Sequence, residues 1–144
     1  MNITLGRGVD RLLFGFTEAQ ARELLGVEDK SYITGLGCLR LQFNTAMLEL
    51  SFEPVNNNRL GWIEVHNPLA TLFGHQLIKK TKQTVLATLI SELGQPSEYE
   101  DYGDFDTAFN EDKWLELHFQ FGHLQNINIG VCYGENEQPL WPNA

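Results

Sequence analysis

The side chains best suited to chemistry in this sequence are carboxylates and imidazoles that alternate with apolar residues in two segments. Each segment also contains a tryptophan, and the residues are Trp62, Glu64, His66, Trp114, Glu116 and His118. Paired carboxylates or paired histidines could perform acid–base catalysis if they met in one groove. No nucleophile elbow, phosphate-binding loop, zinc-binding H-E-x-x-H or dinucleotide fingerprint occurs in the sequence. We therefore expect no catalytic residue, no bound metal and no cofactor.

The same residue types are typical of a protein-binding surface. An exposed tryptophan supplies contact area that binding removes from water, and neighbouring carboxylates can pair with Arg or Lys of a partner. The outward-facing set predicted for this surface is Glu49, Trp62, Glu64, His66, Trp114, Glu116, His118, Asn126 and Asn128. The opposite strand phase would bury the tryptophans, but it would also bury Glu49, Glu64 and Glu116 at a larger cost in free energy.

A second candidate surface is the acidic segment between Glu98 and Glu116, which contains eight acidic residues and one lysine. We expect an acidic loop here, with docking residues that comprise Glu98, Tyr99, Glu100, Asp101, Tyr102, Asp104 and Asp106. Such a patch favours a basic partner, and Phe105 adds an aromatic contact. The alternative is a solvated loop that only keeps the protein soluble. A calcium site is disfavoured because the twelve-residue loop with a closing glutamate is missing.

Alternating apolar residues predict a set of antiparallel strands in each half of the chain, and a helix precedes each set. The first helix begins at Thr17, which forms a capping box with Gln20, and ends at Gly26 after about three turns. The second begins near Thr81 and ends at Gly94 and Pro96. Its predicted apolar stripe is Val85, Leu86, Leu89, Ile90 and Leu93.

Composition limits the class of protein. The chain has 144 residues, of which 42% are hydrophobic, so it can bury a core of ordinary size. Its net charge of −9 disfavours nucleic-acid binding, which requires Lys and Arg. Because we find no signal peptide and no run of 18 apolar residues, we expect a cytoplasmic protein without membrane contact. The two cysteines, Cys38 and Cys132, lack metal-ligand spacing and are expected to be reduced, although a bridge between them stays open.

The sequence also predicts a duplication. The stretch at 43–52 is echoed at 109–119, with Leu-Glu-Leu in both copies. We therefore expect a single domain made of two repeats, at about 7–66 and 67–131, with a short C-terminal tail at 134–144. The expected fold class is α+β: two helix-plus-antiparallel-meander repeats forming one curved sheet, with the helices on its convex face.

Two short motifs around the helices carry a family resemblance. Gly15-Phe16-Thr17 precedes the first helix, and Leu93-Gly94-Gln95-Pro96 follows the second. This arrangement resembles the tandem-repeat fold of the beta-lactamase inhibitor protein and the outer-membrane assembly lipoproteins of the SmpA/OmlA type. Neither half contains both motifs, since Leu25-Gly26 lacks the proline. The resemblance implies a concave sheet that grips another protein.

Our first hypothesis is a non-catalytic inhibitor module. By analogy with bacterial immunity proteins, it would neutralise a basic toxin domain by occluding the active surface of that domain. The alternatives are a small-molecule-binding or hydrolytic domain that uses the concave groove, and a self-associating scaffold subunit. The oligomeric state stays open.

Overall fold

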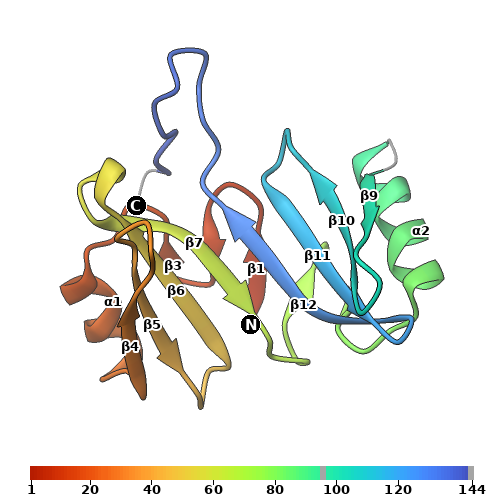
Figure 1. Cartoon of the computed structure of the whole chain (residues 1–144), viewed down its shortest axis with the longest axis horizontal. Helices are drawn as coiled ribbons and strands as arrows, with labels where there is room; N and C mark the ends of the chain where they lie inside the picture. The colour runs from red at the N-terminus through yellow and green to blue at the C-terminus, as the bar shows by residue number, and fades with distance from the viewer. Residues whose placement is uncertain (95–96, 143–144) are drawn as a thin grey trace.

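The computed structural model describes residues 1–94 and 97–142, and its main feature is an eight-stranded antiparallel sheet (Figure 1). The strand order is β4-β5-β6-β7-β12-β11-β10-β9. The bounds are β4 (Lys30–Ile33), β5 (Leu39–Phe43), β6 (Leu48–Glu53), β7 (Arg59–Val65), β9 (Glu98–Asp101), β10 (Asp106–Asn110), β11 (Leu115–Gln120) and β12 (His123–Gly130). Each half of the chain thus contributes four consecutive strands, and β7 pairs with β12 where the halves meet.

The register gives the sheet one apolar face and one polar face. On the apolar face Leu50, Ile63, Ile129 and Leu115 lie opposite one another on β6, β7, β12 and β11. All four are almost completely buried. Side chains alternate between faces along each strand, so the polar residues between these positions lie on the other face. The predicted inward phase of the strands is therefore confirmed.

The first helix, α1 (Glu18–Leu25), begins as predicted. The Thr17 hydroxyl accepts a hydrogen bond from the Gln20 backbone N–H, and the Gln20 side chain accepts one from the Thr17 backbone N–H. The helix has eight residues, so it is shorter than the predicted three turns. Gly26 has a positive φ of 87°, but its ψ of −163° lies outside the left-handed helical region. The predicted type of C-cap is therefore wrong.

Loss of the capping box should have a measurable cost. We expect Thr17→Ala to lower the free energy of unfolding by about 1 kcal/mol, because the Gln20 backbone N–H loses the Thr17 hydroxyl that accepts its hydrogen bond. Urea denaturation measures the change. Thr17→Ser, which keeps the hydroxyl, is the matched control and should lose much less.

The second helix, α2 (Lys82–Leu93), begins and ends where predicted, with Thr81 as its N-cap and Gly94 as a left-handed C-cap. Val85 and Leu89 are buried, whereas Ile90 is 48% exposed. The inclusion of Ile90 in the buried stripe is therefore wrong, because only part of this helix surface contacts the core. The predicted stop at Pro96, like Gln95 of the family motif, lies outside the described residues.

A small second sheet holds the N-terminal segment. Its order is β3-β2-β1-β8, and the strands are β1 (Asn2–Thr4), β2 (Gly8–Val9), β3 (Leu12–Leu13) and β8 (Thr71–Leu72). The single-turn helix η1 (Pro54–Asn56) joins β6 to β7. Because β1 pairs in parallel with β8, the start of the chain is tied to the segment between its two halves. Ile3 and Leu72 are buried in the same core as the large sheet.

Over the described residues, the fold is α+β with two α-helices, the single-turn helix η1 and mostly antiparallel sheet. The duplication, and the placement of the helices on a convex face, stay predictions. In the described part of the chain, neither α-helix combines the length and the apolar composition that crossing a membrane requires. Cys38 and Cys132 are both free thiols.

Candidate functional site

The polar face of the large sheet carries one continuous row of side chains across seven strands. Each residue lies directly opposite the next in the order Gln42, Glu49, Glu64, Asn128, Glu116, Phe109 and Glu98. Directly opposite residues of antiparallel strands lie on the same face with their Cβ atoms close together. The sheet thus brings together four glutamates that are far apart in the sequence.

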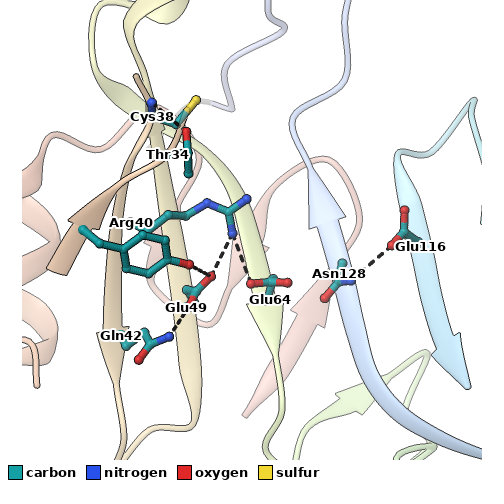
Figure 2. Close-up of polar contacts among 9 residues, drawn as sticks. Thr34, Cys38, Arg40, Gln42, Glu49, Glu64, Glu116 and Asn128 are labelled. Carbon is teal, nitrogen blue, oxygen red and sulfur yellow. Dashed lines mark hydrogen bonds and ion pairs between the residues drawn. The ribbon is translucent and has the colours of Figure 1, made fainter. Parts of the chain in front are cut away.

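At the end of this row on β6 and β7, the Arg40 guanidinium forms ion pairs with two carboxylates. Arg40 Nη1 lies 2.8 Å from Glu49 Oε2 and 3.1 Å from Glu64 Oε2, and Figure 2 shows the guanidinium spanning both. The Tyr32 hydroxyl donates to Glu49 Oε2 at 3.1 Å, and the Gln42 amide donates to Glu49 Oε1. Glu49 therefore has more hydrogen-bond partners than Glu64.

Glu49 accepts more hydrogen bonds than Glu64, and the two carboxylates therefore have different pKa values. Burial and the neighbouring Glu49 carboxylate raise the pKa of Glu64 to about 7, and the attraction of Arg40 only partly opposes this. Burial would also raise the pKa of Glu49, but hydrogen bonds from Glu64, Gln42, Tyr32 and Arg40 outweigh burial and lower it. The pair therefore titrates as a unit that holds one proton near neutral pH.

Such a pair is also what an acid–base catalyst would use. Here, however, the Arg40 guanidinium lies within hydrogen-bond distance of both carboxylates. A substrate atom cannot take the same position between them. The arrangement fits a structural ion-pair network that shapes the face better than it fits a hydrolytic pair.

The centre of the face is built from two equivalent segments that flank β12. The pattern W-x-E-x-H occurs in Trp62-Ile63-Glu64-Val65-His66, which ends one residue after β7, and in Trp114-Leu115-Glu116-Leu117-His118, which begins one residue before β11. Both strands are antiparallel to β12, so they run parallel to each other. Asn128 lies opposite Glu64 on one side and opposite Glu116 on the other. The sequence predicts the named residues of this pattern and Asn128 as outward-facing, and the register brings Glu64, Asn128 and Glu116 side by side.

The histidines differ in their surroundings. His118 is half-buried, and its ring makes an edge contact with Phe105 at 4.6 Å between centroids. Its Nδ1 lies 3.3 Å from the side-chain nitrogen of Asn126. His66 follows the end of β7 and is exposed, but partial desolvation and the nearby His118 lower its pKa. Glu49 opposes that shift.

The acidic segment is a hairpin, which corrects the predicted loop. Residues 98–101 form β9, and β9 pairs with β10 along its whole length. Alternation places Glu98 and Glu100 on the polar face, and it places Tyr99 and Asp101 on the opposite one. The acidic residues therefore do not form one continuous patch.

Asp106 is paired with other residues of the same chain. Its buried carboxylate forms an ion pair with Lys82 of α2 and accepts a hydrogen bond from the Tyr99 hydroxyl. These contacts lower the pKa of Asp106 although burial opposes them. Asp106 and Tyr99 thus hold the hairpin against α2. Asp106 is buried and already paired, whereas Tyr99 is 49% exposed and also lines the hollow described next.

The remaining hairpin residues surround a surface hollow of about 400 Å³. Its lining includes the carboxylates Glu98, Glu100 and Glu116 and the rings of Tyr102 and Phe109. Tyr102 stacks on Phe105 and donates its hydroxyl to Glu100 at 2.7 Å. Asp101 is exposed and accepts from the Gly103 N–H, and Asp104 is exposed at the tip of the hairpin.

The two predicted tryptophan anchors are less exposed than expected. Trp62 is half-buried, and its ring lies so close to Gly130 that an added Cβ there would come within 2.8 Å of it. Trp114 precedes β11 and has a φ of 47°, so it lies in the turn and not in the strand. Its ring makes edge contacts with Phe109 and Tyr133. Both rings pack against their own sheet, so only part of each faces solvent.

Among residues 1–94 and 97–142, no group of three or more His, Cys, Asp or Glu side chains has the arrangement of a metal site. No protein-family model, no curated protein and no solved structure matches the chain. The resemblance to the beta-lactamase inhibitor protein therefore stays a prediction, and the site must be interpreted from its own geometry.

Proposed function

We propose that this chain is a non-catalytic, cytoplasmic protein-binding module whose polar sheet face docks a basic protein domain. Docking would occlude the functional surface of that domain, as an immunity protein neutralises a toxin. The observation that carries the proposal is the hollow beside β9 to β11. It presents three carboxylates, and none of these strands contains a lysine or arginine.

The contrast with the acidic residues that are paired within the chain supports this interpretation. Glu18 and Glu28 pair with Arg22, Glu49 and Glu64 share Arg40, and Asp106 pairs with Lys82. For Glu98, Glu100 and Glu116, no ion pair forms within the described ranges. Uncompensated carboxylates beside aromatic rings suit Arg and Lys side chains, which pair with the charge and stack on the rings.

Cross-linking in the native host tests the proposal. A photo-reactive amino acid placed at Tyr102, on the exposed side of the hollow, should capture a protein with a basic surface. Glu100→Lys in the same chain should strongly reduce the cross-link. Glu23→Lys, which makes the same charge change at an exposed position of α1, should leave it intact. Equal capture in both variants, or capture of an acidic partner, would contradict the proposal.

The captured partner then permits a kinetic prediction. We expect Glu100→Lys to slow association roughly tenfold at low salt, because it replaces attraction of a basic surface by repulsion. The difference should shrink as ionic strength rises, since salt screens exposed charges. Stopped-flow or surface-based kinetics at several salt concentrations measure it. An association rate unaffected by the charge reversal would assign the hairpin to solvation alone.

A further inference from the structure

The centre of the polar face contains buried polar atoms that have no partner. Within the part of the chain that the structure describes, there are four such side-chain atoms: Arg40 Nε, His118 Nε2, Asn126 Oδ1 and Asn128 Oδ1. All four belong to the polar face. Asn126 is 7% exposed and Asn128 is 4% exposed. Unpaired buried polar groups are costly, so a native fold that keeps several together indicates that something else satisfies them.

The neighbouring side chains determine which way the amides of Asn126 and Asn128 are oriented. The Asn128 side-chain nitrogen points to Glu116 Oε1 at 3.5 Å, and a flipped amide would set two acceptors against each other (Figure 2). This orientation leaves the Asn128 side-chain oxygen buried and without a hydrogen-bond partner. The Asn126 nitrogen faces His118 Nδ1, which leaves the Asn126 oxygen unpaired in the same way. Two carbonyl-type acceptors thus lie side by side on β12.

Carboxylates stand on both sides of these acceptors. Glu64 and Glu116 are half-buried and reach solvent, and each lies opposite Asn128. The only guanidinium nearby, that of Arg40, is already shared between Glu49 and Glu64. Within residues 1–94 and 97–142, the one side-chain hydrogen bond of Glu116 is the long one from Asn128, at 3.5 Å. This central cluster, defined as Glu64, Glu116, His118, Asn126 and Asn128, is rich in acceptors and short of positive charge.

We propose that the central cluster is the subsite for one arginine side chain of the basic partner. The proposal rests on the docking function above and names the group that the centre of the face recognises. A guanidinium carries five N–H donors in one plane, so it can pair with the accessible Glu116 and bind the two buried amide oxygens once the side chains covering them move aside. A lysine ammonium has three donors on one atom and matches the spread acceptors less well. Phe109, directly opposite Glu116, supplies an aromatic ring beside the subsite.

Nuclear magnetic resonance on the full chain tests this subsite with three small probes. They are Nα-acetyl-arginine amide, the equivalent lysine compound, and the citrulline compound, which keeps the shape of arginine without its charge. We expect the arginine probe to shift the side-chain amide signals of Asn126 and Asn128. The lysine probe should bind more weakly, and the citrulline probe should leave both signals unchanged.

Paired variants sharpen the test. Glu116→Gln should weaken arginine binding roughly tenfold, because it removes a charge-assisted hydrogen bond. Glu111→Gln, which removes an exposed carboxylate from the turn before β11, should not. Unshifted asparagine signals with the arginine probe, or equal shifts with citrulline, would overturn the proposal and assign the unpaired oxygens to ordered water.

A basic peptide separates this inference from the docking proposal. If an arginine-containing peptide shifts the backbone signals of β9 and β10 while Asn126 and Asn128 stay unchanged, docking stands and the subsite is refuted. If the peptide shifts neither set and cross-linking at Tyr102 also fails, the docking proposal itself is refuted. Shifts in both sets, reduced together by Glu116→Gln, support both.

Discussion

Ile63→Ala is expected to lower the free energy of unfolding by about 2–5 kcal/mol, which is a large share of the roughly 5–15 kcal/mol typical of a domain. Ile63 is fully buried on β7 and lies between Leu50 of β6 and Ile129 of β12. Truncation removes apolar contact on both sides and leaves a cavity at the junction of the two halves. The loss should therefore destabilise the whole sheet and not one half alone.

Urea denaturation followed by tryptophan fluorescence and by circular dichroism measures this effect. We expect one transition by both probes, in wild type and variant, because the core is continuous across β7 and β12. Val27→Ala is the matched control, since Val27 is 85% exposed and should change stability by less than about 0.5 kcal/mol. Two separate transitions would show that the halves are independent units.

The strands that the sequence could predict are those with strict alternation. Leu48-Glu49-Leu50 and Leu115-Glu116-Leu117 place their apolar residues on one face and their glutamates on the other, as the register shows. Alternation reports which face each side chain occupies because the strand period is two residues. It does not report which strand lies beside which, since pairing depends on distant segments. The W-x-E-x-H repeat shows that two strands are equivalent, but not that β12 separates them.

The elements that escaped prediction depend on long-range contacts. Glu98–Asp101 lacks the apolar residues typical of strands, yet it forms β9 because β10 supplies hydrogen-bond partners and Lys82 holds Asp106 beside Tyr99. The pairing of Asn2 with Thr71 joins segments that no local pattern connects. Unpaired atoms such as Asn128 Oδ1 arise only after folding, so no sequence pattern could point to them.

The stability of the wild-type protein should fall as pH rises from 5 to 8, and Glu64 is the main expected cause. Its folded pKa of about 7 lies above its ordinary value of 4.5, so the folded state keeps a proton that the unfolded state has released. That contribution is fully present below the unfolded pKa and is lost as pH rises through 7. Glu49, whose pKa is lowered, is ionised in both states across this window and adds no slope.

Glu64→Gln isolates the effect, because glutamine stays neutral and can still donate a hydrogen bond to Glu49. We expect the variant to be more stable than wild type by roughly 1–3 kcal/mol at pH 8 and about equal at pH 5. His66 acts in the opposite direction, since its lowered pKa makes the folded state lose its proton first as pH rises. The measured quantity is therefore the difference between variant and wild type at each pH. Glu98→Gln, which removes an exposed carboxylate, is the control and should show the same dependence of unfolding free energy on pH as wild type. If Glu64→Gln also shows the wild-type dependence, Arg40 already neutralises the pair and Glu64 is not the cause.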